Sequence, residues 1–287
     1  MAAGLIEVEF SGPFLAMDTH ELKKAAEAAR HIWAHWQAGE TLRELPAGCR
    51  PSTPLEGYAA QAQLPEISGR SVLGWKLAAT SAVGQAHIQV SGPLAGRLLS
   101  GKVFADGAAL SLFGNRMRVA EPEFAFLMGR DLPPRETAYS QDEVMAAVAD
   151  LHLGLEAPDS RFAVFEKAGE AQLIADNACA GQYVLGPAAP PVWRAIDLSR
   201  HAVTGKVRTA RGDCWTRDGV GAAVLGDPRV ALTWLANRLS SLGLTLKEGE
   251  IITTGTCMTP LEIGPGDAVE ADYGVLGQVR LSFLTEE

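Results

Sequence analysis

The clearest amphipathic pattern in the chain lies near its amino end. Asp18 and Thr19 are suitable caps for the first turn of a helix, and Gly39 is a suitable end. Between them, apolar side chains recur every three or four residues, which predicts one amphipathic helix. The apolar stripe consists of Leu22, Ala26, Ala29, Trp33 and Trp36. His31 and His35 lie four residues apart on this helix, where a packing role is favoured over a metal site.

A proline-rich segment follows this helix. Residues 39–69 contain four prolines and have the composition of a loop. We therefore expect residues 1–70 to form a small helical unit, joined to a main domain over residues 71–287.

Beyond residue 71 the pattern changes to short apolar runs bounded by glycine and proline, which is typical of β-strands. The β-character of these runs comes from apolar and β-branched residues in stretches too short for helices. The expected strands include 71–77, 118–128, 182–185, 202–208, 250–254, 267–271 and 277–283.

Two helices are expected among these strands. The first begins with a capping box at Ser140 and ends before Pro158, with Glu156 at its carboxyl end. Its apolar face would consist of Val144, Val148, Leu151 and Leu155. The second runs from a cap at Asp227 to Gly243. Because strands and helices do not alternate as in βαβ units, we predict an α+β fold, a mixed β-roll with flanking helices.

The composition is that of a globular protein, and it excludes several function classes. The 287 residues are 47% hydrophobic and 21% charged. The net charge of -9 argues against a nucleic-acid partner, which needs clustered basic residues. The chain lacks an uninterrupted apolar run of about 18 residues, and residues 1–10 lack a basic signal-peptide segment. The four cysteines form no CxxC pair, so we expect free thiols in a reducing cytoplasm and no membrane partner.

The strongest chemical signal is Glu121-Pro122-Glu123, set in an apolar run. On a strand, the two glutamates face the same side. Buried carboxylates this close repel each other unless a divalent cation binds them, and oxygen ligands favour magnesium or manganese. The alternative is a solvent-facing edge strand, where Pro122 is tolerated. Glu156 is the candidate third carboxylate.

Four further polar positions are candidates for substrate contacts. Lys76 stands inside an apolar strand, so it either pairs with an anion or points to water. Asp176, Asn177 and Thr256 lie in short polar segments between strands. Such segments bind carboxylates through N–H and hydroxyl donors, but they are equally ordinary turns.

In their order along the chain, these residues resemble the 2-keto-4-pentenoate hydratase and 4-oxalocrotonate decarboxylase family of the fumarylacetoacetate hydrolase-like superfamily. The resemblance implies a mixed β-roll, a homo-oligomer, a divalent metal (Mg²⁺ or Mn²⁺) held by Glu121, Glu123 and Glu156, and an active-site lysine, Lys76. The segments that carry it are Gly74-Trp75-Lys76, Glu121-x-Glu123, Glu156, Asp176-Asn177-Ala178, Leu225-Gly226-Asp227-Pro228 and Thr254-Gly255-Thr256.

The sequence departs from this family at two places. Leu94 stands where hydratases carry an aspartate, and Cys179-Ala180 replace two serines. The resemblance implies a lyase that acts on unsaturated 2-oxo acids, and the favoured reaction is that of a hydratase. The alternatives are a decarboxylase, an acylpyruvate hydrolase and a relative without catalytic activity. It implies a catalytic role for Lys76. Because Leu94 is not a carboxylate, activation of water would need another catalytic base, with Glu156, His152 and a metal-bound hydroxide as the candidates. The residues expected to contact the substrate are Lys76, Asp176, Asn177, Thr256 and Leu94.

Overall fold

The computed structural model describes residues 12–285, and its strands outnumber its α-helices. The α-helices are α1 (Thr19–Ala38), α2 (Pro54–Ser68), α3 (Ala82–Ile88), α4 (Gln141–Met145), α5 (Glu170–Ala175) and α6 (Pro228–Ser241). The strands are β1 (Val72–Ala78), β2 (Leu94–Leu99), β3 (Val103–Ala105), β4 (Ala109–Leu110), β5 (Val119–Met128), β6 (Val148–Ala157), β7 (Gln182–Ala188), β8 (Ala202–Arg208), β9 (Cys214–Val220), β10 (Ile251–Thr256), β11 (Leu261–Glu262), β12 (Ala268–Asp272) and β13 (Gln278–Phe283). Short single-turn segments are η1 (Gly12–Ala16), η2 (Phe165–Lys167), η3 (Asn177–Cys179), η4 (Pro191–Ala195), η5 (Leu198–Arg200), η6 (Gly221–Ala223) and η7 (Gly274–Leu276).

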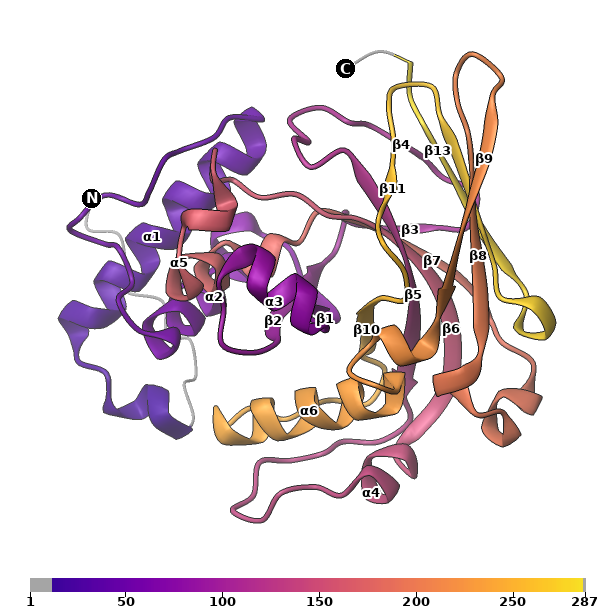
Figure 1. Cartoon of the computed structure of the whole chain (residues 1–287). Helices are drawn as coiled ribbons and strands as arrows, with labels where there is room; N and C mark the ends of the chain where they lie inside the picture. Colours follow the sequence, from indigo (N-terminus) through magenta and orange to yellow (C-terminus); the bar gives the residue numbers. More distant parts are fainter. Residues whose placement is uncertain (1–11, 286–287) are drawn as a thin grey trace.

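The strands form two mixed sheets. The larger has the order β2-β1-β10-β5-β6-β7-β3, and the smaller has the order β4-β13-β12-β8-β9. Only residues 100–102 separate β2 from β3, the two ends of the larger sheet. Because that connection spans roughly 14 Å at most, the sheet curls until its ends lie close together. This mixed roll with helices beside it (Figure 1) confirms the predicted fold class.

Helix α1 forms where the sequence predicts it. The Asp18 carboxylate accepts hydrogen bonds from the backbone N–H groups of His20 and Glu21, and the Glu21 side chain accepts one from the Asp18 N–H. Gly39 ends the helix with φ 66°, which suits a residue without a Cβ. Both ends of the predicted helix are therefore confirmed. Its buried residues are Ala25, Ala28, Ala29, Ile32 and Trp33.

The predicted loop over residues 39–69 is wrong, because half of it is α2. Thr53 and Glu56 form a reciprocal capping box at its start, and Pro54 occupies the first turn. Proline is favoured there, since the N–H it lacks would have no helical partner. Pro65 lies inside the last turn. The prolines that indicated a loop are compatible with helix at these positions.

The predicted helix from Ser140 to Pro158 is also wrong. It ends after one short turn, α4, and the chain continues as strand β6. This strand lies between β5 and β7, and both of its faces are largely buried. Its apolar residues therefore do not alternate with polar ones, and their spacing imitates a helix. Glu156 consequently stands on a central strand, not at a helix end.

The helices pack beside the sheets and share one core with them. Helices α1, α2 and α5 contact one another and lie together on one side of the molecule (Figure 1), while α6 packs against β10. One hydrophobic cluster includes side chains from α1, α2 and both sheets. The boundary expected at residue 70 stays a prediction.

Helices within residues 12–285 are all too short or too polar to cross a membrane. The expectation of no signal peptide concerns residues 1–10, which lie outside the described part of the chain.

Candidate metal centre and active site

Three carboxylates from two neighbouring strands converge in the curled sheet. Glu121 of β5 lies directly opposite Glu156 of β6, and Glu123 lies opposite Gly154. Carboxylate oxygens of the three glutamates all lie within 4.8 Å of one another. Glu123 and Glu156 are buried and Glu121 is half-buried. Since β5 is a central strand between β10 and β6, the alternative of a solvent-facing edge strand is wrong.

These carboxylates carry more negative charge than their surroundings compensate. Burial, and next the charge of Glu156, raise the pKa of Glu121 to about 7. The same two causes raise the pKa of Glu123 well above its usual value. Glu123 Oε2 accepts a hydrogen bond from the Gly255 N–H at 2.9 Å, whereas its Oε1 has no partner within the described chain. A buried oxygen cluster with an unpartnered atom fits a hard divalent cation.

Lys76 of β1 supplies one positive charge to this cluster. Its side chain is only 2% exposed, and its Nζ lies 3.1 Å from Glu156 Oε2. It also donates a hydrogen bond to the Ala178 carbonyl at 3.0 Å. Burial lowers the pKa of Lys76, but the neighbouring glutamates more than offset this effect and hold the pKa above its usual value. Lys76 is therefore the inward, paired lysine that the sequence offered as one of two alternatives.

A left-handed turn brings the Ala178 carbonyl to Lys76. Asn177, Ala178 and Cys179 have φ values of 57°, 52° and 57°. Three consecutive side-chain-bearing residues in this region cost about 1–2 kcal/mol each, so the surroundings must impose the conformation. Just after the turn, the backbone of Gly181 favours the charged form of Glu156 and so lowers its pKa, although burial raises that pKa overall. The turn thus contacts the lysine and one glutamate through its backbone.

Strand β2 holds this turn from one side. The Asn177 side chain accepts a hydrogen bond from the Arg97 N–H at 2.7 Å and donates one to the Arg97 carbonyl at 2.9 Å. A Cβ at Gly96 would lie 2.3 Å from the Asn177 carbonyl oxygen, so only glycine allows the turn to come this close. The Asn177 amide is therefore engaged by the backbone of β2.

A buried ion pair holds the turn from the other side. The Arg161 guanidinium pairs with Asp176 and donates hydrogen bonds to the carbonyls of Asp176 and of Ala180, the latter at 2.7 Å. The Ser160 hydroxyl donates to Asp176 at 2.6 Å. Asp176 and Asn177, predicted as substrate contacts, are fully buried and bonded within the protein. The structure brings them to the edge of the site, where they support the turn.

The remaining predicted residues lie around the same cluster. Leu94 begins β2 and is buried, paired in register with Ala78 at the end of the lysine strand. Thr256 ends β10 in register with Glu123, is half-buried, and donates its hydroxyl hydrogen to the Met258 carbonyl at 2.9 Å.

Sequence reasoning assigned no role to two tyrosines that contact the strands of the carboxylates, although Tyr273 lies in one of the segments, Asp272-Tyr273-Gly274, on which the family resemblance rests. Tyr183 of β7 lies directly opposite Glu156, and its ring occupies the space that a Cβ on Gly154 would need. The Tyr273 hydroxyl donates a hydrogen bond to the Glu123 carbonyl at 2.9 Å. Both come from distant segments, and their spacing along the chain contains no signal of this contact. They pack against the two strands that carry the glutamates.

Comparisons with known proteins agree with this geometry. Residues 102–283 match the family described as fumarylacetoacetate (FAA) hydrolase C-terminal. A 2-keto-4-pentenoate hydratase from Paraburkholderia xenovorans (strain LB400) is 33% identical over 264 residues, covering 91% of this chain and 95% of that protein. The 2-keto-4-pentenoate hydratase 3 from Pseudomonas putida has the same identity and coverage.

Among solved structures, a 4-oxalocrotonate decarboxylase from Pseudomonas putida G7, complexed with magnesium and adipate, superposes with a TM-score of 0.81. It is 25% identical, and the match covers 91% of this chain and 98% of that chain. The chain therefore belongs to the fumarylacetoacetate hydrolase C-terminal family, in the group formed by 2-keto-4-pentenoate hydratases and 4-oxalocrotonate decarboxylases.

Proposed function

We propose that this protein is a divalent-metal-dependent hydratase of the 2-keto-4-pentenoate type, a lyase that adds water to an unsaturated 2-oxo acid. The observation that carries the proposal is the convergence of Glu121, Glu123 and Glu156 beside the buried ammonium of Lys76. The hydratase relatives, which align over nearly the whole chain, support the choice of reaction.

The three glutamates would hold the metal ion, with magnesium or manganese favoured by their oxygen ligands. When bound, the ion supplies Lewis-acid chemistry, drawing electron density from the 2-oxo acid and stabilising the negative charge of its enolate form. The unpartnered Glu123 Oε1 and the raised pKa values in this cluster support the presence of such an ion.

Lys76 would bind and orient the substrate and move a proton. Two of its three N–H groups have partners, Glu156 and the Ala178 carbonyl. The third is available for an anionic substrate group or for delivery of a proton to the conjugated chain. Because both contacts favour the charged amine, Lys76 stays an ammonium until a substrate approaches.

A decarboxylase acting on a 2-oxo-3-enedioate is the second candidate, and Leu94 is the observation that favours it. A buried leucine next to the lysine strand cannot activate water as the hydratase aspartate would. If the protein is a hydratase, Glu156 would be the base that takes a proton from water.

A melting experiment tests the site. Magnesium together with oxalate, a mimic of the chelating end of a 2-oxo acid, should raise the unfolding midpoint, because both bind only the native state. The shift should vanish in a Glu121→Gln, Glu123→Gln double variant, which keeps the side-chain shapes. The absence of a shift in the wild type would contradict the proposed metal site.

Two substrates separate the reactions. Loss of diene absorbance from 2-hydroxypenta-2,4-dienoate would support the hydratase. Release of carbon dioxide from 2-oxo-3-hexenedioate, with the diene left unchanged, would support the decarboxylase instead. The homo-oligomer and the cytoplasmic location expected from the sequence stay predictions, and light scattering on the purified protein tests the first of them.

A further inference from the structure

A second group of side chains that can bind a metal comes from α1 and from the segment between α1 and α2. Glu27 and His31 are one helical turn apart on α1, and Cys49 follows in the segment that leads to α2. One ligand atom from each of these three residues lies within 4.8 Å of the other two. Carboxylate, imidazole and thiolate are all ligands of zinc, and two of them come from positions i and i+4 of one helix.

The pair of histidines noted in the sequence does not form this group. His35 Nδ1 is hydrogen-bonded to the His31 carbonyl at 2.7 Å, so that nitrogen is engaged by the backbone. Glu27 is exposed and His31 half-buried, and within residues 12–285 neither side chain has a hydrogen bond or ion pair. Cys49 is buried, and its thiol makes only a 3.5 Å contact to the Pro46 carbonyl. The three ligand atoms are therefore free to turn toward a common cation.

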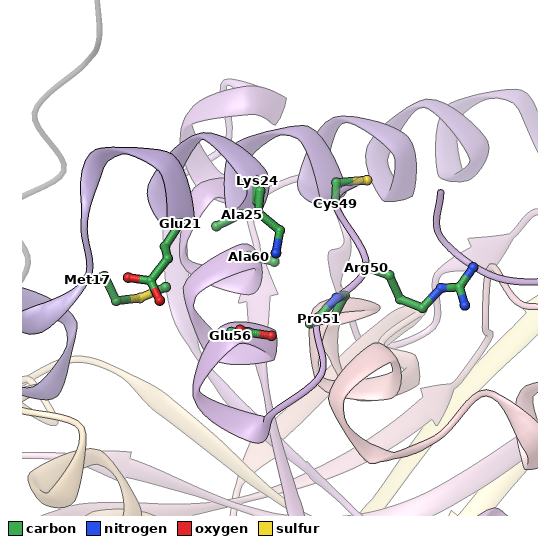
Figure 2. A pocket seen from close by; sticks show the side chains of 9 residues that line it. All are labelled: Met17, Glu21, Lys24, Ala25, Cys49, Arg50, Pro51, Glu56 and Ala60. Atoms are coloured by element: carbon green, nitrogen blue, oxygen red, sulfur yellow. The ribbon is translucent and has the colours of Figure 1, made fainter. Parts of the chain in front are cut away.

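Two basic residues, Lys24 and Arg50, lie near this group. Figure 2 shows the Lys24 side chain entering the small pocket beside Cys49, on whose floor Glu56 lies, while the Arg50 guanidinium points away from Cys49. Arg50 also pairs with Glu44 at 2.8 Å. Burial, and next the charge of Glu27, raise the pKa of the Cys49 thiol.

We propose that Glu27, His31 and Cys49 bind a zinc ion, with one oxygen, one nitrogen and one sulfur ligand and with water completing the tetrahedron. Binding would require the thiol to lose its proton to solvent, so one proton is released for each ion bound. The ion would join the segment that carries Cys49 to α1. This site lies on different elements from the glutamates of β5 and β6, and it does not depend on the proposed catalytic function.

Cobalt(II) gives a direct test, because a cobalt–thiolate bond produces a charge-transfer band that oxygen and nitrogen ligands do not. The wild type should show this band at one equivalent of cobalt. It should disappear in Cys49→Ser and weaken strongly in Glu27→Gln, an exposed position where the fold tolerates the change. Cys214→Ser, which removes an exposed thiol elsewhere, is the matched control and should keep the band.

The Glu121→Gln, Glu123→Gln variant separates this site from the catalytic one. In that background the cobalt band should persist, and zinc should still raise the unfolding midpoint. The same zinc shift should be lost when Glu27→Gln is added. A wild type without the band, or a band that survives Cys49→Ser and disappears in Cys214→Ser, would overturn the proposal.

Discussion

Replacing Gly96 with alanine should disable the active site without touching any carboxylate. The new Cβ would lie 2.3 Å from the Asn177 carbonyl oxygen and 3.1 Å from Lys76 Cδ, whereas ordinary contacts begin near 3.4 Å. The carbonyl must therefore retreat by about 1 Å. Since Ala178 follows directly in the left-handed turn, its contact with the Lys76 ammonium at 3.0 Å would stretch beyond hydrogen-bond distance.

The size of the effect follows from these distances. Overpacking a tight contact costs about 1–3 kcal/mol of unfolding free energy. For a chain of this length, that corresponds to an unfolding midpoint roughly 2–5 °C lower. Misplacing a catalytic group by about 1 Å costs on the order of 100-fold in rate. We therefore expect kcat/KM on 2-hydroxypenta-2,4-dienoate to fall far more than the modest loss of stability explains.

The matched control is Gly92→Ala, in the loop just before β2. A Cβ there meets no atom within 4 Å, and the residue has no left-handed φ. Both variants would be compared with the wild type by thermal unfolding and by loss of diene absorbance. If Gly96→Ala resembled Gly92→Ala in both measurements, the proposed role of the turn in placing Lys76 would be refuted.

Three further predictions concern charge and strain around the site. In metal-free protein, the pKa of Glu121 is raised from 4.5 to about 7, so its contribution to stability is present below pH 4.5 and is lost as the pH rises through 7. The unfolding midpoint of wild-type protein treated with a metal chelator should therefore fall steadily as the pH rises over this range. A Glu121→Gln variant whose midpoint falls equally with pH would contradict this reasoning. Ala178→Gly relieves a left-handed φ of 52°, so it should raise the free energy of unfolding by up to about 1 kcal/mol. Because the main-chain oxygen at this position remains, kcat/KM should stay close to that of the wild type. Denaturant unfolding and turnover measure the two effects, and a loss of stability would count against the strain argument. Burial and the charge of Arg161 lower the pKa of Lys102 to about 8. Lys102→Met should therefore stabilise the protein near pH 7 by on the order of 1 kcal/mol. Equal thermal unfolding midpoints for this variant and the wild type would disprove the prediction.

The sequence predicts the parts of this molecule that depend on short-range rules. Asp18 and Gly39 define α1 because caps act within one turn of the helix. Glu121 and Glu123 share a face because side chains alternate along any strand. The ordered motifs also indicate the family, which the comparisons confirm.

The parts that the sequence does not predict depend on what lies next to each segment. Strand β6 has helix-like apolar spacing because the rest of the folded chain buries both of its faces, and no residue pattern within the segment indicates that burial. Tyr183 reaches Glu156 only through the pairing of β6 with β7. The left-handed conformation of Asn177 is likewise imposed by Arg97, eighty positions away. Such contacts appear only once the chain has folded.

The turn over Asn177–Cys179 also bears on how this family diverges. Its contribution to the site is the main-chain oxygen of Ala178, so the side chains at 179 and 180 can change without removing it. The cysteine and alanine that replace two serines here therefore leave the contact with residue 76 intact. At these positions the site depends on the backbone conformation of the turn, and the identity of the side chains matters less.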